Sequence, residues 1–197
     1  TILTEYARNG SLHEMLELEK SGLSPKDWDQ SKKIIIAYGI ACGMSYLHSN
    51  SIIHRDLKPH NILLDSYLYP KISDFGLSRI NEFISASMNF ASRKGLKGTP
   101  IYTAPEIFEN NDYTFASDVY AFGIIIFQIF TLDDPFPESN IYGIIKSLID
   151  GNRPQIKDDV PEFFKDLIER CWSQDPKSRP TFAQITEEMK NIDIANN

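Results

Sequence analysis

One apolar stretch constrains the fold more than any other feature of the sequence. Residues Val119 to Leu132 are apolar apart from Gln128 and Thr131. A membrane-spanning helix needs roughly 20 apolar residues, so this stretch is too short to cross a bilayer. It predicts instead a buried core helix that Asp118 opens and that the following Asp-Asp-Pro sequence ends. The other elements of the chain must pack around that helix.

Periodic apolar residues predict further helices around it. A long helix is expected from about 28 to 49, because four apolar residues recur there every three or four positions and bury one face: Ile36, Ile40, Met44 and Leu47. A capping box of Ser11 and Glu14 opens a short helix before it. Three more helices are expected near 140–150, 161–172 and 181–190, and the short apolar pieces at 62–64 and 71–73 predict a β-hairpin.

Charge and cysteine content exclude several kinds of protein. The chain has 197 residues with 20 basic against 27 acidic side chains, a formal net charge of -7. This balance argues against nucleic acid as the main partner and against an anionic membrane surface. Cys42 and Cys171 lie far apart in apolar runs, outside any zinc or disulfide pattern. We interpret them as buried, reduced thiols and expect a cytoplasmic location.

The residues that can carry chemistry cluster between positions 54 and 76. His-Arg-Asp-Leu-Lys-Pro-His-Asn at 54–61 is followed by Asp-Phe-Gly at 74–76. Asp56, Asn61 and Asp74 offer the hard oxygen atoms that magnesium binds alongside phosphate and water. A carboxylate close to Lys58 can accept a proton while the lysine neutralises charge on a phosphate. The cluster therefore suits phosphoryl transfer from a nucleotide.

The order of these motifs resembles the large, C-terminal lobe of a eukaryotic protein kinase. The sequence carries H-R-D-L-x-x-x-N, then D-F-G, then A-P-E at 104–106. Asp-Val-Tyr-Ala-Phe-Gly at 118–123 extends the resemblance, as does Cys-Trp at 171–172. It implies a protein-kinase-like fold, large lobe only, which is mainly α with a short β-hairpin and a hinge strand. The partial kinase domain would cover 1–190, with a polar tail at 191–197.

The resemblance implies a role for each matching position. Asp56 would be the catalytic base, Lys58 would contact the transferred phosphate, and Asn61 and Asp74 would hold Mg2+. The residues implied to bind ATP are the hinge residues Thr4, Glu5, Tyr6 and Ala7, Leu63 beneath the adenine, and Lys58, Asn61 and Asp74.

Other matching residues would have structural roles. His54 and Phe75 would join a hydrophobic stack between the lobes, Glu106 and Arg179 would form an ion pair, and Asp118 would brace the catalytic loop. Three further histidines are interpreted as incidental surface or helix-end residues: His13, His48 and His60.

Local features indicate the substrate. Lys58-Pro59 and the run at 98–102 resemble serine/threonine kinases, with Thr99 touching the catalytic aspartate in the substrate loop. The expected partner is a protein with an acceptor serine or threonine. The residues at 171–182 resemble the tyrosine-kinase-like branch of the serine/threonine kinases. In the basic loop 77–98 three serines are either plain loop residues or phosphosites that could pair with Arg55: Ser85, Ser87 and Ser92.

The 197 residues contain neither a G-x-G-x-x-G loop nor a V-A-I-K lysine. Because an active kinase needs these small-lobe parts, we expect them upstream in the same chain and little activity from this segment alone. Three interpretations stay open: a fragment of an active serine/threonine kinase, a catalytically dead kinase-like binding or scaffold module, and a product without function. The intact Asp56, Asn61 and Asp74 favour the first.

Overall fold

The computed structural model describes residues 7–74, 100–110, 113–137 and 140–192. Most of the expected hinge and all of the basic loop 77–98 lie outside these residues. So do the following predicted positions: Thr4, Glu5, Tyr6, Phe75, Ser85, Ser87, Ser92 and Thr99.

The described part of the chain is mainly helical with one two-stranded sheet, as the sequence predicted. In chain order its elements are α1 (Leu12–Lys20), α2 (Gln30–Ser49), the 3-10 turn η1 (Pro59–Asn61), β1 (Ile62–Leu64), β2 (Pro70–Ile72), the 3-10 turn η3 (Pro100–Tyr102), α4 (Pro105–Asn110), α5 (Phe115–Thr131), α6 (Ile141–Ile149), α7 (Glu162–Cys171), the 3-10 turn η4 (Pro176–Ser178) and α8 (Phe182–Met189).

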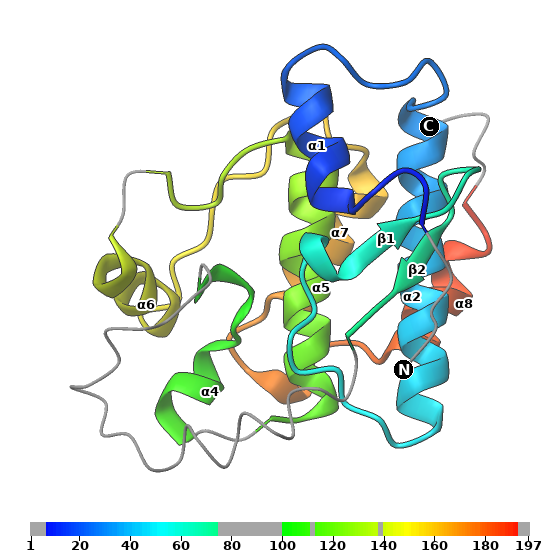
Figure 1. Cartoon of the computed structure of the whole chain (residues 1–197). Coiled ribbons are helices and arrows are strands. Elements are labelled where there is room, and N and C mark those ends of the chain that lie inside the picture. The colour runs from blue at the N-terminus through cyan, green and yellow to red at the C-terminus, as the bar shows by residue number, and fades with distance from the viewer. Residues whose placement is uncertain (1–6, 75–99, 111–112, 138–139, 193–197) are drawn as a thin grey trace, which may run out of the picture.

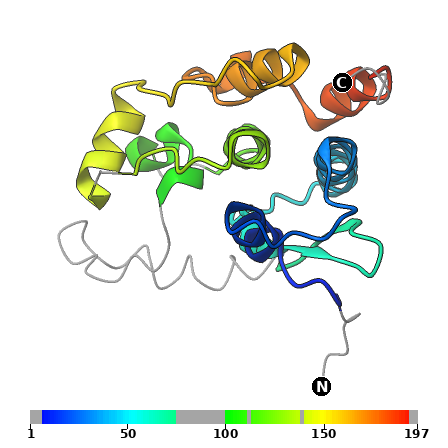
Figure 2. The ribbon, with the colours of Figure 1, turned by 90° about the horizontal axis from the view of Figure 1, so that it is seen from above.

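The elements lie in three layers (Figures 1 and 2). Helices α7 and α8 form one outer layer, α5 and α2 form the middle layer, and α1 lies with the hairpin on the opposite side. Helices α4 and α6 pack together beside α5. The middle layer is therefore covered on both faces, which explains why α5 is apolar all round.

Helix α5 is the centre of the core. The predicted stretch from Val119 to Phe127 is buried throughout, as is Ile129. Close packing against α7 requires a small residue, because a Cβ atom added to Gly123 would lie 2.9 Å from Cys171 Cβ. None of the described helices has the length and apolarity that a membrane span requires.

Helix α2 buries the predicted apolar face. Its four periodic residues are all at most 5% exposed: Ile36, Ile40, Met44 and Leu47. A polar contact ties the start of α2 to the end of α1, since Lys33 Nζ lies 2.6 Å from Glu19 Oε1 and Trp28 Nε1 donates to Glu19 Oε2. The expectation of two buried thiols was wrong in part. Cys171 is buried, but Cys42 is only half-buried on α2.

The hairpin sets the position of the residues that flank it. Strand β1 pairs antiparallel with β2, with Ile62 opposite Ile72. The same register brings Asn61 beside Ser73, whose N–H donates to Asn61 O at 2.9 Å. The chain entering α1 is bonded to the other end of β1, because Leu64 N donates to Gly10 O at 2.8 Å. The hairpin thus joins α1 and the segments before and after it into one unit.

Candidate active site

Residues 50–58 form a loop whose start is held by the core helix α5. Asp118, in the first turn of α5, is 2% exposed. Its Oδ2 accepts a hydrogen bond from His54 N at 2.8 Å, and its Oδ1 accepts one from Arg55 N at 2.9 Å. Both bonds use backbone groups, so this carboxylate fixes the path of the loop directly.

A third group reaches the same carboxylate. His48 Nε2, in the last turn of α2, lies 2.9 Å from Asp118 Oδ2. The ring of His48 is enclosed by the aromatic rings of Phe115 and Phe182. The interpretation of His48 as incidental is therefore wrong. It is part of the contact set that satisfies a buried charge, as buried carboxylates require.

Two residues of the site have left-handed backbone conformations. Arg55 has φ 69° and Asp74 has φ 60°, values that non-glycine residues rarely adopt. Such conformations persist where surrounding contacts fix them. At Arg55 that contact is the bond from its N–H to Asp118, and Asp74 follows Ser73, which is bonded to Asn61.

His54 links the loop to the hairpin. Its ring is fully buried, and its Nε2 lies 3.0 Å from Ser73 O. A carbonyl can only accept, so Nε2 carries the proton. Asp56 N donates to His54 Nδ1 at 3.3 Å, which requires Nδ1 to be unprotonated. The hydrogen-bond network thus assigns a neutral ring to His54, in agreement with a packing role.

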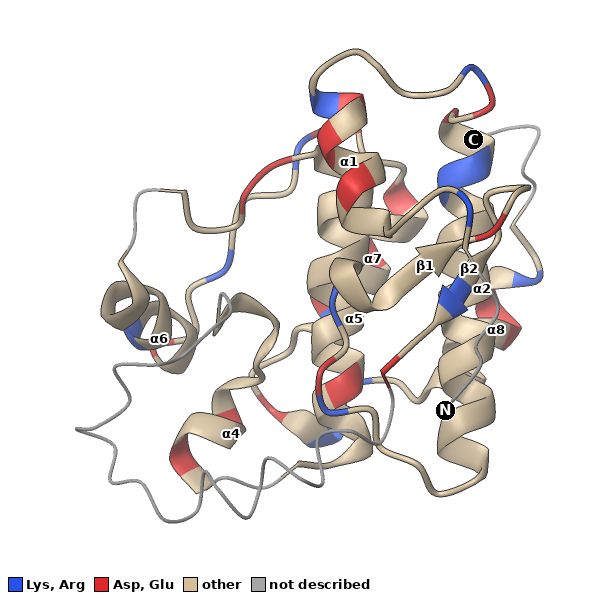
Figure 3. Ribbon diagram, viewed as in Figure 1, with Lys and Arg blue, Asp and Glu red and all other residues tan. Residues whose placement is uncertain are grey.

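Asp56 is the centre of the site. Lys58 Nζ lies 2.9 Å from Asp56 Oδ1 and 2.8 Å from Oδ2, and Asn61 Nδ2 donates to Oδ2 at 2.9 Å. The Asp56 side chain is nevertheless 53% exposed. It lies in a groove of about 730 Å³ that runs from α1 past the loop to η3 and the end of α5. A carboxylate oriented by two donors and open to a groove can meet a hydroxyl group. Figure 3 shows both signs of charge on this loop.

Asn61 and Asp74 supply oxygen atoms suited to magnesium. Asn61 Nδ2 also donates to Asp56 O at 2.8 Å. Since the amide nitrogen is used in this way, Oδ1 is the amide atom that remains to bind a metal ion. Within the described ranges no hydrogen-bond donor is bonded to that Oδ1. The Asp74 side chain is exposed, with Oδ2 accepting from Ser73 Oγ at 3.1 Å.

Asn61 and Asp74 alone would not complete the coordination shell of a magnesium ion. Over the described residues, no group of three or more His, Cys, Asp or Glu side chains could hold a metal ion. One amide and one carboxylate leave most of an octahedral shell to phosphate and water, which is how Mg2+ is usually bound beside a nucleotide.

His13 and His60 were also interpreted as incidental surface or helix-end residues; His60 is indeed exposed, but the two rings are in contact with each other. Their rings stack with centroids 3.9 Å apart and planes at 17°. Both line the groove beside Asp56. Partial desolvation of the exposed His60 side chain lowers its pKa, and the neighbouring His13 and Lys58 lower that pKa further, while Asp56 and Glu14 oppose the shift.

Two predicted adenine contacts lie at the edge of the hairpin. Leu63, in the middle of β1, is half-buried and forms a bridge with Ser11 at the start of α1. Ala7 is half-buried in the chain leading to α1. The structure places both near the N-terminal end of the described chain, and their contact with adenine stays a prediction.

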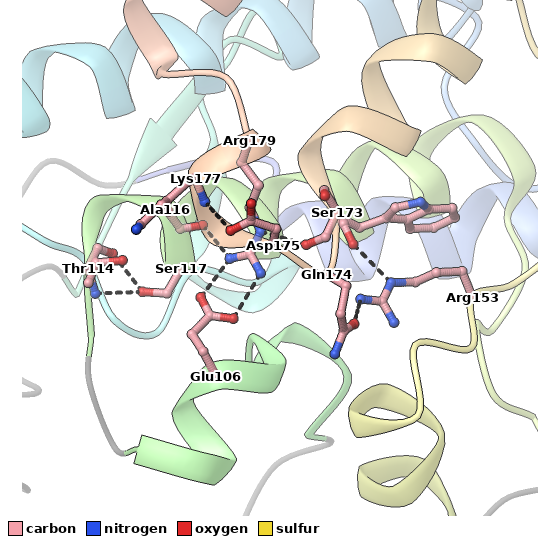
Figure 4. Close-up of polar contacts among 11 residues, drawn as sticks. Glu106, Thr114, Ala116, Ser117, Arg153, Ser173, Gln174, Asp175, Lys177 and Arg179 are labelled. Atoms are coloured by element: carbon pink, nitrogen blue, oxygen red, sulfur yellow. Dashed lines mark hydrogen bonds and ion pairs between the residues drawn. The ribbon is translucent and has the colours of Figure 1, made fainter.

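Glu106 and Arg179, far apart in sequence, point toward each other (Figure 4). Arg179 Nη1 lies 2.6 Å from Glu106 Oε1, and Nη2 lies 2.8 Å from Oε2. Arg179 also donates to Ala116 O and Ser173 O, and its side chain is 0% exposed. The pair therefore joins α4 to α5 and to the segment between α7 and α8.

Comparison with known proteins finds protein kinases that match nearly the whole chain. The family described as "Protein tyrosine and serine/threonine kinase" matches residues 1–189. "RGS domain-containing serine/threonine-protein kinase A" of Dictyostelium discoideum is 39% identical over 190 residues, which is 96% of this chain and 16% of that protein. "Serine/threonine-protein kinase VIK" of Arabidopsis thaliana is 36% identical over 97% of this chain and 43% of that protein.

A third relative is named differently. "Dual specificity protein kinase shkA" of Dictyostelium discoideum is 39% identical over 81% of this chain and 31% of its own length. The chain thus spans less than half of each of these relatives.

Proposed function

The chain belongs to the protein tyrosine and serine/threonine kinase family, whose members phosphorylate proteins with ATP and magnesium, and on that premise we propose a specific activity. It is the large-lobe part of a domain that transfers the γ-phosphate of ATP to serine or threonine hydroxyls of protein substrates. The observation that carries the proposal is the Asp56 carboxylate, which Lys58 and Asn61 orient at an open groove.

In the proposed reaction Asp56 accepts the proton of the substrate hydroxyl. The hydroxyl oxygen forms a bond to the γ-phosphorus as the bond from that phosphorus to the β–γ bridging oxygen breaks, and ADP leaves. Lys58, already bonded to Asp56, is placed to neutralise charge on the transferred phosphoryl group. Asn61 and Asp74 would hold magnesium, which supplies further charge neutralisation when bound.

We also propose the substrate residue, the adenine contacts and the cellular location. Lys58-Pro59 supports serine and threonine over tyrosine, and the run at 171–182 supports the tyrosine-kinase-like branch. Thr4, Glu5, Tyr6, Ala7 and Leu63 are proposed to contact adenine, and Thr99 to contact Asp56 in the substrate loop. A cytoplasmic location is proposed from the two free thiols in the described residues.

The test compares the full-length natural protein with two variants. Asp56→Asn removes the proposed base, whereas Asp158→Asn is the matched control at an exposed position that does not line the groove. Each protein is incubated with Mg-ATP and peptides that differ only in an acceptor serine, threonine or tyrosine, and phosphopeptides are measured by mass spectrometry. General-base catalysis contributes roughly 10²- to 10⁴-fold. We therefore expect Asp56→Asn to lose at least about 100-fold and Asp158→Asn to match wild type.

Other outcomes would change the proposal. Equal activity of wild type and Asp56→Asn would remove Asp56 from catalysis. An inactive wild type would favour a kinase-like binding module. Phosphorylation of the tyrosine peptide as fast as the others would replace serine/threonine specificity by dual specificity.

A further inference from the structure

The stacked histidines join two elements that are distant in sequence. His13 lies on α1 and His60 lies in η1, directly before Asn61. Their ring centroids are 3.9 Å apart and their planes are inclined by 17°. Flat rings at this separation and angle are in direct contact over their faces, so neither ring can move towards the other, and separating them would lose the stacking contact.

The geometry of Asn61 depends on the segment that contains His60. On its C-terminal side, Asn61 O accepts bonds from Ser73 N at 2.9 Å and Ser73 Oγ at 3.1 Å, which fix it to the hairpin. On its N-terminal side the turn is closed by Asn61 N donating to Lys58 O at 2.9 Å. The stack on His13 is a side-chain contact that holds the middle of this short turn.

Helix α1 is a firm support for such a contact. Asn9 N donates to Leu64 O, and Leu64 N donates to Gly10 O, so the start of α1 is bonded to β1. The Ser11–Glu14 capping box fixes the first turn, in which His13 lies. His13 is thus held by the same hairpin that holds Asn61, and the stack closes a ring of contacts from β1 through α1 to η1.

We propose that His13 is a positioning residue for Asn61. By stacking on His60, it keeps η1 oriented so that Asn61 Nδ2 bonds to Asp56 and Asn61 Oδ1 faces the magnesium-binding side. The inference rests on the proposed function, because it assigns a use to Asn61 Oδ1. His13 itself touches neither magnesium nor the reacting atoms.

The size of the effect follows from the contact. The contact energy of a stacked ring pair is enough to change the equilibrium between the stacked and unstacked arrangements by about 2- to 12-fold. Residues that orient metal ligands usually change metal affinity by roughly 10-fold or more when replaced. We expect loss of the His13 ring to weaken metal binding about 3- to 10-fold.

The experiment measures metal binding apart from catalysis. Mn2+ is titrated into the full-length natural protein with saturating ADP and followed by electron paramagnetic resonance. His13→Ala and His13→Leu remove the flat ring, His13→Phe restores one, and Leu18→Ala is the control on an exposed face of the same helix. We expect weaker Mn2+ binding for His13→Ala and His13→Leu, values within about twofold of wild type for His13→Phe, and no change for Leu18→Ala.

The outcomes separate this inference from the proposed function. A wild-type protein that binds no Mn2+ with ADP overturns both. Wild-type affinity in His13→Leu, or equal weakening in His13→Phe and His13→Leu, overturns the positioning role alone. If His13→Ala does not fold, the comparison of His13→Phe with His13→Leu decides, because both variants fill the space of the ring with apolar atoms.

Discussion

Replacing Glu106 by glutamine tests how the buried ion pair stabilises the fold. The substitution keeps the shape of the side chain and removes its charge. Arg179 would then be a fully buried guanidinium whose remaining acceptors are Ala116 O at 3.0 Å, Ser173 O at 2.9 Å and one neutral amide oxygen. The side chain is 0% exposed, so the positive charge keeps these acceptors but has lost its negative partner.

The magnitude follows from the burial of the pair. Removing one partner of a buried ion pair costs roughly 3–5 kcal/mol. Two carbonyl bonds persist and Glu106 is 14% exposed, so we expect a loss near the lower limit, about 3 kcal/mol. With a urea m-value of roughly 2 kcal/mol per M, the midpoint of unfolding falls by about 1.5 M. That is a large part of the 5–15 kcal/mol that usually stabilises a domain.

Urea unfolding followed by tryptophan fluorescence measures this change. Glu109→Gln is the control, because Glu109 is exposed on the same helix. Arg179→Met in the Glu106→Gln background removes the uncompensated charge, so we expect the double variant to be more stable than Glu106→Gln alone. A loss below about 1 kcal/mol for Glu106→Gln, or a double variant less stable than the single one, would refute this reasoning.

Two further predictions concern the contact between α5 and α7. Gly123→Ala places a Cβ atom 2.9 Å from Cys171 Cβ and 3.3 Å from Trp172 N, so we expect a loss of about 1–3 kcal/mol in the same urea assay, and unchanged stability would show that α7 moves aside at no cost. Burial strongly raises the pKa of the Cys171 thiol, which keeps it protonated at pH 8. A thiol reagent at pH 8 should therefore label half-buried Cys42 in the folded protein and Cys171 only after unfolding, and fast labelling of Cys171 without urea would contradict its burial.

Local sequence signals were enough to predict most of the described helices. The capping box at Ser11, the apolar periodicity of α2 and the continuous apolar run of α5 each depend on residues a few positions apart. These signals act within one element, so they can be read without knowing where the element lies. The hairpin was predicted for the same reason, from apolar pieces that are too short to form helices.

The contacts between distant residues could not be predicted in this way. His48 and Asp118 are 70 positions apart, and their contact depends on how α2 packs beside α5. The stack of His13 on His60 depends on the hairpin bringing α1 to η1. Nothing in the local sequence distinguishes these histidines from ones that make no such contact. The roles expected for Asp56 and Asn61 came instead from the resemblance of their motif to protein kinases. The structure then identifies the residues that are hydrogen-bonded to them.

The attachment of the loop to Asp118 has a consequence for the energy of reaction. Because the N–H groups of His54 and Arg55 are bonded to Asp118 of the buried helix α5, the conformation of this backbone is held by the core of the protein and needs no substrate to hold it. Dipoles that are fixed in advance need not rotate as charge develops, so little reorganisation energy is added to a barrier. The folded protein thus surrounds the loop with dipoles of fixed orientation, whereas water molecules in their place would have to reorient.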